Sequence, residues 1–298
     1  MNILITGSSG LLGSALVASL TAAGHRVTRL VRTERGRNAG DVYWNAEAGT
    51  LDLAGLEGIE AAVHLAGETI SERWTAEKKA RILESRVAST RLLCERLGEM
   101  KRPPKVLVSA SAIGYYGDRG GELLDEQSTS GSGFLADVCR QWEASTGPAE
   151  AVGIRTVRLR TGVVLSASGG ALAKMLPPFR MGVGGKLGAG DQYMSWIAID
   201  DWIGIVQHAL ASDTLTGPVN AVAPNPVTNL EFTKTLGKIL RRPTIFPVPA
   251  FAVRLLFGEM GQELLLGSAR VAPRKLIETG YKFRYTALEA ALRAVLKA

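Results

Sequence analysis

The glycine spacing directly after the first apolar segment constrains the fold more than any other feature of this chain. Residues 2–20 read NILITGSSGLLGSALVASL, so Gly7, Gly10 and Gly13 form a G-x-x-G-x-x-G motif between an expected strand and an expected helix at 11–23. The first glycine of such a turn lets the chain reverse, the second lets the backbone approach a pyrophosphate, and the third lets the helix pack on the strand. The free N–H groups of the helix N-terminus then favour an anion. The motif therefore predicts a dinucleotide-binding βα unit at the start of the chain.

Strand-like and helix-like segments alternate after that unit. We expect further strands at 25–32, 60–67, 104–111, 154–165 and 217–223, and further helices at 75–99, 134–146 and 201–212. Such alternation is typical of a parallel sheet with helices on both faces. The sequence therefore predicts an α/β fold, namely a Rossmann doubly wound parallel sheet with a smaller C-terminal substrate-side lobe.

Two regions interrupt the alternation and indicate the domain organisation. Residues 166–195 are rich in glycine, and prolines and short helical patterns dominate from 225 onward. We therefore expect a Rossmann domain at 1–165, continued by 196–224, and a smaller substrate or lid lobe at 166–195 and 225–298. A lobe of this kind covers the ligand crevice at the carboxyl ends of the strands.

The composition is that of a globular chain and argues against several classes of protein. Its 298 residues are 46% hydrophobic, and the net charge of +7 comes from scattered basic residues, so we expect no nucleic-acid partner. No apolar run is long enough to span a bilayer and no signal peptide precedes the first strand, so we expect no membrane partner. Cys94 and Cys139 are too few for a disulfide scaffold, which favours a reducing, cytoplasmic location. The His, Cys and carboxylate residues lack metal-ligand spacing, so we expect no metal site.

The end of the second expected strand indicates which dinucleotide is preferred. Proteins that bind NAD usually place Asp or Glu there to hold the ribose 2′-hydroxyl. This chain instead has Val31 and Arg32, with Arg29 before them and Arg35 and Arg37 just beyond. A guanidinium binds a phosphate through two parallel hydrogen bonds. We therefore expect the cofactor to be NADP (NADPH), with a solvated basic loop as the alternative interpretation.

Several longer motifs carry a resemblance to a known family. The glycine motif, VHLAG at 63–67, SASAIGYYG at 109–117 and the DD pair at 200–201 resemble the extended short-chain dehydrogenases/reductases (SDRs). The segments GFLADVCRQWE, RTGVVLS, GGALAKMLPPFRMGVGGKLGAG and QYMSWIAIDD resemble more closely an atypical YfcH-type subgroup, the epimerase family or nucleoside-diphosphate-sugar epimerase-like proteins. The resemblance covers most of the chain, and the C-terminal part is similar to the small C-terminal domain of that subgroup.

The resemblance implies where the cofactor would be contacted. By similarity, Leu65 and Ala66 would line the adenine–ribose side, and Val164 would lie near the nicotinamide. Arg86, which stands where the family has an asparagine, would reach the cofactor. The full set of residues expected to bind the cofactor is Thr6, Gly7, Gly10, Leu11, Leu12, Gly13, Val31, Arg32, Leu65, Ala66, Gly67, Arg86, Ser109 and Val164.

The same resemblance implies a catalytic set of Asn, Ser, Tyr and Lys. In that set the tyrosine transfers a proton, and the lysine cation favours its ionised form. Ser111 falls at the serine position, but the Tyr-x-x-x-Lys segment reads Phe134 to Val138. Shifting the register by one residue gives Leu135 and Cys139. Neither register supplies a proton-transferring pair, so we do not expect the standard chemistry of the family.

Four further residues are candidates for contact with a substrate. Tyr115 and Tyr116 follow Ser111 on a loop, and either could donate a hydrogen bond to a substrate oxygen or pack its ring on the sheet edge. Ser195 and Trp196 stand where many sugar-nucleotide enzymes of the family carry an arginine, and Trp196 could stack on a ligand or pack in the core. The missing arginine weakens the case for a nucleotide-sugar substrate.

Two functions therefore remain open. In the first, the chain is an NADP-dependent oxidoreductase or epimerase acting on a small polar or sugar-like substrate, with Ser111 and a loop tyrosine in its site. In the second, it is a non-catalytic NADP(H)-binding sensor or regulatory protein. The resemblance also leaves a homodimer open, since helices of SDR-like folds often pair.

Overall fold

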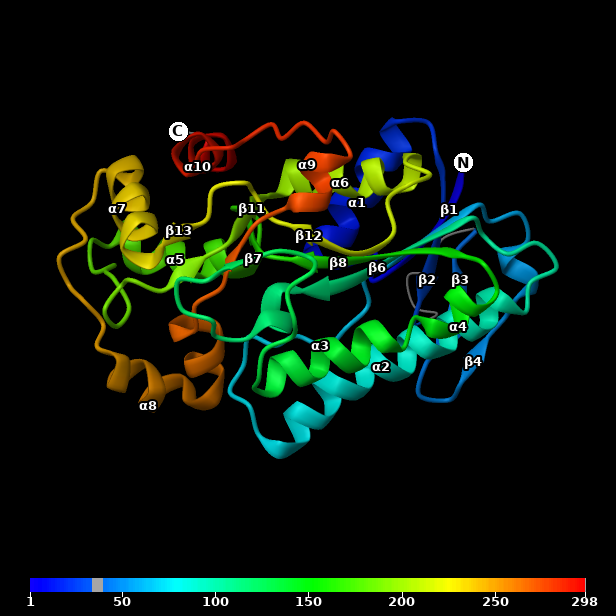
Figure 1. Ribbon diagram of the computed structural model, residues 1–298, viewed down its shortest axis with the longest axis horizontal. Helices are drawn as coiled ribbons and strands as arrows, with labels where there is room; N and C mark the ends of the chain where they lie inside the picture. The colour runs from blue at the N-terminus through cyan, green and yellow to red at the C-terminus, as the bar shows by residue number, and fades with distance from the viewer. Residues whose placement is uncertain (34–39, 298) are drawn as a thin grey trace.

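A large central sheet organises the chain, of which the computed structural model describes residues 1–33 and 40–297 (Figure 1). Arg35 and Arg37 lie outside the described residues. The strands of this sheet are β1 (Asn2–Thr6), β2 (Arg26–Val31), β3 (Val42–Asn45), β4 (Thr50–Leu51), β5 (Ala61–His64), β6 (Val106–Ala112), β8 (Arg155–Thr161) and β12 (Gly217–Ala221). Their spatial order is β12-β8-β6-β5-β1-β2-β3-β4. Neighbours from β12 to β3 are parallel, whereas β4 pairs antiparallel with β3.

Helices cover both faces of this sheet. One face carries α1 (Leu11–Ala22) and α6 (Ile199–Ala211), which pack against each other. The opposite face carries α2 (Ala76–Gly98), α3 (Phe134–Ala144) and the short α4 (Gly147–Ala151), as Figure 1 shows below the sheet. A parallel sheet needs such covers because both of its faces are apolar.

The first strand shows how this two-sided burial is encoded. Ile3 and Ile5 belong to the apolar core that includes side chains of α1 and α6, whereas Leu4 between them belongs to the core that includes side chains of α2. Successive side chains of a strand point to opposite faces, so an uninterrupted apolar run is buried on both sides. The predicted Rossmann doubly wound α/β fold is confirmed.

Smaller elements pack beyond the central sheet. They include three two-stranded sheets, which pair β9 with β11, β10 with β13 and β7 with β14. Their strands are β7 (Leu123–Leu124), β9 (Val163–Leu165), β10 (Tyr193–Met194), β11 (Trp196–Ala198), β13 (Val227–Thr228) and β14 (Arg270–Val271). The helices are α5 (Gly170–Arg180), α7 (Asn229–Leu240), α8 (Ala250–Gly261), α9 (Arg274–Glu278) and α10 (Leu288–Leu296), with short turns η1 (Ala54–Leu56), η2 (Ile113–Tyr116) and η3 (Gln262–Leu266). No described helix is both long enough and apolar enough to cross a membrane.

Asp201 ties the C-terminal segment back to the Rossmann half. Its carboxylate accepts the backbone N–H of Arg284 at 2.7 Å and that of Tyr285 at 2.9 Å. The Tyr281 hydroxyl also donates to the Asp201 carbonyl at 2.9 Å. The buried carboxylate of Asp201 therefore holds residues 281–285 against α6. Asp201 does not cap this helix, because the N-cap position is occupied by Ala198.

Candidate functional site

The glycine turn between β1 and α1 has the geometry that the motif predicts. Gly7 has a φ of +66°, and a Cβ added there would lie 2.7 Å from the Leu65 carbonyl carbon. A Cβ on Gly13 would lie only 2.1 Å from the Gly7 carbonyl oxygen, so α1 can approach the turn only with glycine at this position. Gly10 is different because it is exposed, and a Cβ there would meet nothing closer than the Gly7 oxygen at 3.4 Å. Gly10 therefore leaves its outer side open to a ligand.

Two of the residues expected to touch the cofactor are structural instead. The Thr6 hydroxyl accepts the N–H groups of Leu65 and Ala66 at 3.0 and 3.1 Å, which ties the end of β1 to the segment after β5. Ser109 in β6 is, like Thr6, completely buried. Neither side chain has surface left for a ligand, so the prediction of direct contact is wrong for both. Thr6 contributes by positioning residues 65 and 66 beside the turn.

Several other predicted cofactor residues lie near the turn and keep some exposed surface. Leu11, Leu12, Val31, Leu65 and Ala66 are half-buried, and Gly67 is exposed. The Arg86 guanidinium covers Gly67, since a Cβ there would lie 3.3 Å from Arg86 Cζ. Arg86 donates to the carbonyls of Ile82 and Glu68 at 3.1 and 3.0 Å, which fixes its position.

Arg32 carries a positive charge just after β2, the strand that pairs with β1. It is exposed and forms no ion pair with any residue in the described parts of the chain. Arg29, three residues earlier, is committed to Asp41 through two hydrogen bonds of 2.8 and 2.5 Å. The pKa of Glu68 is lowered, first by its hydrogen bond to Lys78 and also by the charge of Arg32. This cationic surface at the end of β2 suits an added phosphate.

Helix α5 also approaches the glycine turn. A Cβ on Gly170 would lie 3.2 Å from the Leu11 side chain, so the start of α5 approaches the glycine turn. Val164 in β9 is half-buried in the same region, with its carbonyl oxygen 4.0 Å from that Cβ position. Lys174 of α5 donates to the Ser71 hydroxyl at 2.6 Å and thereby bridges α5 to the loop that precedes α2. Residues 103 positions apart make this contact, so no local sequence signal indicated it.

The two registers considered for the missing Tyr–Lys pair have different surroundings in the structure. Gly114 lies in η2, directly after the strand that carries Ser111. A Cβ on Gly114 would lie 3.2 Å from Leu135 Cβ and 3.8 Å from Cys139 Sγ. Leu135 and Cys139 therefore face the end of β6. Phe134 and Val138 pack in an apolar cluster that includes Trp74, Ile82 and Met260, and Leu135 also packs against this cluster. Neither register supplies a side chain that could act as the expected Tyr–Lys pair.

Ser111 belongs to a buried charged network. Its hydroxyl donates to Glu143 Oε1 at 2.7 Å, and Arg160 holds the same carboxylate through Nε and Nη2, each at 2.8 Å. Glu143 lies four residues after Cys139 on α3, on the side that faces β6. This spacing is a signal in the sequence that could have indicated Glu143 as a site residue. The ion pair fixes Ser111 at the carboxyl end of its strand.

The two loop tyrosines have different environments. Tyr116 is completely buried, and its hydroxyl lies 2.8 Å from both the Asp125 carbonyl oxygen and Asn220 Oδ1. Burial raises the pKa of Tyr116 to about 12. Tyr115 is half-buried, with its ring centroid 3.4 Å from Arg160 Cζ. Tyr116 is therefore removed from the candidates for substrate contact, and Tyr115 is kept.

The proposed substrate residues in the segment after residue 190 are also structural. Trp196 is completely buried in the main core, and its indole N–H donates to the Asn225 carbonyl at 3.0 Å. The Ser195 hydroxyl donates to the Ala269 carbonyl at 2.8 Å and accepts the Val271 N–H at 2.9 Å. Both predictions of substrate contact are wrong, because the aromatic face is used in packing and the hydroxyl joins β14 to the body of the protein.

The N-terminus of α3 receives a carboxylate that no local sequence pattern singled out. Glu263 of η3 accepts the N–H groups of Phe134 and Leu135, each at 2.9 Å. Free N–H groups at a helix start favour such a negative group. The C-terminal segment thus contacts the start of α3, the helix in which the resemblance implies a tyrosine and a lysine.

His64 is a packed core residue, as its place in a buried strand indicates. It is completely buried, and its Nδ1 lies 2.7 Å from the Thr6 hydroxyl. Burial lowers the pKa of His64 from 6.5 to about 4. As the pH falls, the imidazole binds a proton in the unfolded chain before it does so in the folded protein. The contribution of neutral His64 to the free energy of unfolding is therefore complete above pH about 6.5 and is lost as the pH falls toward 4. No metal cluster of three or more His, Cys, Asp or Glu side chains occurs within the described ranges.

The acid sensitivity of His64 is testable by urea denaturation. Between pH 7.5 and pH 5, wild type is expected to lose about 2 kcal/mol more of its free energy of unfolding than His64→Gln, which has no imidazole to protonate. Comparing each protein with itself at the two pH values removes the cost of the substitution. Parallel losses in the two proteins would contradict the assignment.

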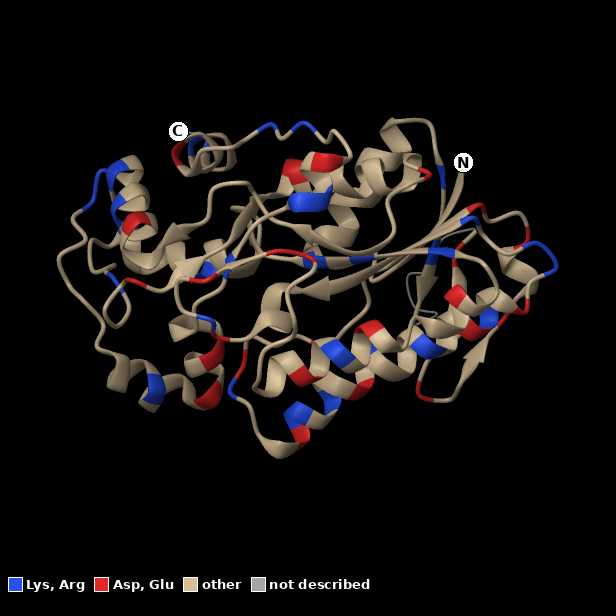
Figure 2. Cartoon of the chain, viewed as in Figure 1, with Lys and Arg blue, Asp and Glu red and all other residues tan. Residues whose placement is uncertain are grey.

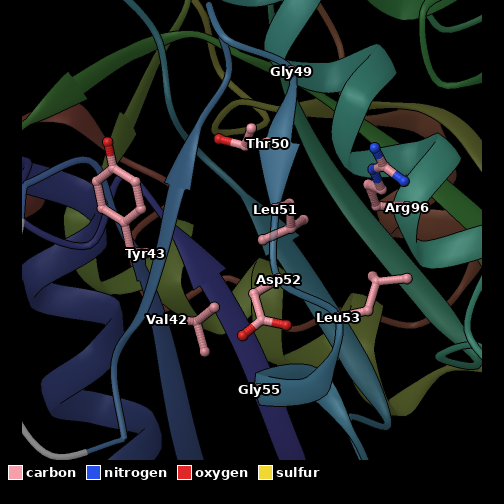
Figure 3. Close-up of a pocket in the computed structure, with 9 residues that line it drawn as sticks. All are labelled: Val42, Tyr43, Gly49, Thr50, Leu51, Asp52, Leu53, Gly55 and Arg96. Carbon is pink, nitrogen blue, oxygen red and sulfur yellow. The ribbon is translucent and has the colours of Figure 1, made fainter.

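A separate hollow lies at the β3–β4 edge of the sheet. Its volume is about 620 Å³, and Figure 3 shows its lining residues Val42, Tyr43, Gly49, Thr50, Leu51, Asp52, Leu53, Gly55 and Arg96. The Asp52 carboxylate accepts the Ala54 N–H at 2.9 Å, and Arg96 pairs with Glu99 at 2.7 Å. None of the predicted site residues lines this hollow, and its charged groups are already engaged.

The sheet order and the glycine turn define a class, the dinucleotide-binding Rossmann proteins of the extended SDR type. Comparison with known proteins gives the family within it. The model of the NAD dependent epimerase/dehydratase family matches residues 3–221, and a domain of unknown function, DUF1731, matches 248–295. The chain belongs to the NAD dependent epimerase/dehydratase family, which confirms the resemblance carried by its motifs.

Individual relatives resemble this chain over nearly its whole length. An epimerase family protein of Mycobacterium tuberculosis is 43% identical over 97% of this chain and 95% of its own. Human epimerase family protein SDR39U1 is 37% identical over 99% of this chain and all of its own. A crystal structure of the human protein with NADPH has a TM-score of 0.90 at 36% identity, covering 100% of this chain and 99% of that one. The Thermotoga maritima UDP-glucose 4-epimerase, with a TM-score of 0.79 over 100% of this chain and 98% of that one at 19% identity, shares the fold.

Proposed function

We propose that this chain binds NADP(H) above the glycine turn and acts as an oxidoreductase or epimerase on a small polar or sugar-like substrate. The observation that carries the proposal is the turn itself, in which Gly7 and Gly13 are required for packing while Gly10 stays open to a ligand. The free charge of Arg32 supports a preference for the phosphorylated coenzyme. The crystal structure of human SDR39U1 with NADPH supports the same choice.

Arg32→Ala tests the coenzyme preference. We expect wild type to bind NADPH more tightly than NADH, and the substitution to weaken NADPH about 10- to 100-fold, since hydrogen bonds to a charged group contribute about 1.5–3 kcal/mol. NADH affinity should hardly change. Isothermal titration calorimetry with both coenzymes measures this, with Arg26→Ala at the other end of β2 as the matched control. Equal affinities of wild type for the two coenzymes would refute the role of Arg32.

The chemistry of the proposed enzyme would rest on Ser111 and Tyr115. When bound, the nicotinamide supplies the acceptor or donor of a hydride. The Ser111 hydroxyl is buried and donates its hydrogen bond to Glu143, so a substrate hydroxyl would have to donate to the lone pairs of its oxygen. Tyr115 is the loop hydroxyl that is not buried, and the Arg160 guanidinium lies against its ring. This division lets Ser111 orient a substrate hydroxyl while Tyr115 exchanges its proton.

The second candidate function is a non-catalytic NADP(H)-binding sensor or regulatory protein. It is favoured by one observation, namely that Leu135 and Cys139, which face the end of β6, supply neither a phenol nor a cation there. Burial raises the pKa of Cys139 to about 12, so its thiol is neutral and brings no charge to this region. In this function the coenzyme would bind without being oxidised or reduced.

One pair of variants distinguishes the two candidates. If the protein is an enzyme, Ser111→Ala and Tyr115→Phe should abolish oxidation of bound NADPH by a panel of small carbonyl compounds without changing NADPH affinity. Stopped-flow fluorescence of the bound coenzyme follows both quantities. If wild type oxidises no NADPH with any member of the panel, the sensor function is supported instead.

The remaining parts of the proposal concern organisation and location. We propose that 166–195 and 225–298 form the substrate-side lobe, because α5 and η3 contact the glycine turn and the start of α3. A reducing, cytoplasmic compartment is supported by Cys94 and Cys139, which are both free and buried. A relative in Arabidopsis thaliana is described as chloroplastic, so the family also occurs in other compartments.

A further inference from the structure

An exposed apolar ridge runs along the outer side of the small lobe. Three of its side chains project from α8, where Phe251 is 70% exposed, Leu255 73% and Leu256 63%. The preceding segment adds two more exposed side chains, and a neighbouring turn after α5 adds one. We define the apolar ridge as Met181, Ile245, Phe246, Phe251, Leu255 and Leu256. Exposed apolar side chains gathered on one lobe in this way are typical of an interaction site.

The ridge is held in place by the rest of the lobe. Arg242 donates to the Arg180 carbonyl at 2.9 Å, and the N–H of Val248 donates to the Lys186 carbonyl at 2.8 Å. A Cβ on Gly185 would lie 1.8 Å from the Phe246 carbonyl oxygen, so these two segments are in close contact. Figure 1 shows α8 and the segment that leads to it at the outer edge of the molecule. The exposed side chains thus stand on a fixed surface.

Unpaired arginines flank the ridge. Arg180, Arg241, Arg242 and Arg254 form no ion pair with a carboxylate in the part of the chain that the structure describes. Figure 2 shows basic residues on α8 and at the end of α7. The acidic residues at the end of α8 are engaged elsewhere, because Glu259 pairs with Lys79 at 2.8 Å and Glu263 caps α3. The surface therefore combines apolar side chains with uncompensated positive charge.

We propose that the apolar ridge docks on the anionic surface of a lipid membrane. Exposed apolar side chains can insert among lipids while nearby arginines contact the anionic headgroups. This is adsorption without spanning, and it departs from the expectation of no membrane partner, which considered spanning segments alone. The net charge of +7 favours the same partner.

Two other occupants fit the surface less well. A partner helix needs a groove, whereas side chains exposed by 63–73% project outward from the fold. A symmetric dimer through the ridge would place the arginine-rich rims of both copies together, where like charges repel. The membrane satisfies both the apolar and the charged parts of the surface.

Co-sedimentation of the full-length protein with vesicles tests the proposal. We expect binding to phosphatidylcholine vesicles that contain phosphatidylglycerol, weaker binding at high salt, and little binding to pure phosphatidylcholine. Leu255→Ser/Leu256→Ser should abolish binding, and Arg241→Gln/Arg254→Gln should weaken it roughly 30-fold. The matched controls are Leu123→Ser and Arg284→Gln, which alter exposed residues away from the ridge.

Three outcomes would overturn the proposal. One is that the wild-type protein does not bind the anionic vesicles, and another is that the ridge variants bind them as tightly as the controls do. The third is a wild-type dimer in sedimentation velocity that Leu255→Ser/Leu256→Ser converts to a monomer, which would assign the ridge to a second copy. NADPH affinity should be unchanged in every variant, so this test is independent of the proposed coenzyme function.

Discussion

Gly13→Ala is expected to lower the free energy of unfolding by about 3 kcal/mol or more, and to remove NADPH binding with it. The new Cβ would lie 2.1 Å from the Gly7 oxygen and 2.8 Å from Ser8 Cα, both backbone atoms of the turn. Backbone cannot move aside as the end of a side chain can, so α1 must shift away from β1. The gain of about 1 kcal/mol from replacing glycine by alanine within a helix is too small to offset this clash.

Gly10→Ala is the matched control because it changes another glycine of the same turn. Its Cβ would approach nothing closer than 3.4 Å, so urea denaturation should give nearly wild-type stability. NADPH affinity should nevertheless fall, because the added methyl projects into the space that a pyrophosphate would use. A Gly10→Ala protein with full NADPH affinity would show that the coenzyme does not lie over this turn. Wild-type stability of Gly13→Ala would show that the close approach of α1 is not required.

The first half of the fold was predictable because its signals are local. The glycine motif and the apolar run of β1 specify the βα unit within the first 22 residues. The β3–β4 hairpin was missed because VYWN at 42–45 and the two-residue strand at 50–51 are too short to show a period. Strands of this length form because the sheet beside them offers free edge groups, which is a tertiary cause.

The site was predictable in part, and its errors share one origin. A tryptophan can either stack on a ligand or fill a core, so the residue type at position 196 does not distinguish the two roles. The burial of Trp196 depends on the packing of β11, which no local sequence pattern encodes. The register of the expected Tyr–Lys pair stayed open in the sequence because neighbouring positions of α3 differ by about 100° around the helix. That rotation decides whether Leu135 or Phe134 faces β6, and only the docking of the helix fixes it.

The absence of the Tyr–Lys pair determines which charged groups surround Ser111. Leu135 and Cys139 bring no charge to the end of β6, so the charges nearest Ser111 are those of Glu143 and Arg160. These two groups satisfy each other through two hydrogen bonds of 2.8 Å. The pair holds Ser111 in place, and it makes the region dependent on an intact buried ion pair.

Arg160→Met is therefore expected to cost about 3–5 kcal/mol of the free energy of unfolding, because it leaves the Glu143 carboxylate buried without its cation. The Tyr116 hydroxyl would also lose the N–H that Arg160 donates to it at 3.0 Å. Urea denaturation at pH 7 measures the loss. NADPH affinity of the folded variant should remain close to that of wild type, since Arg160 lies on β8, away from the glycine turn.

A double-mutant cycle separates the ion pair from the loss of side-chain packing. Glu143→Leu/Arg160→Met removes both charges together, and its cost should be well below the sum of the two single substitutions because no uncompensated charge remains buried. Additive costs would mean that the carboxylate and guanidinium are independently hydrated. In that case Ser111 would not be held by a dry ion pair, and its assignment to substrate binding would lose its structural basis.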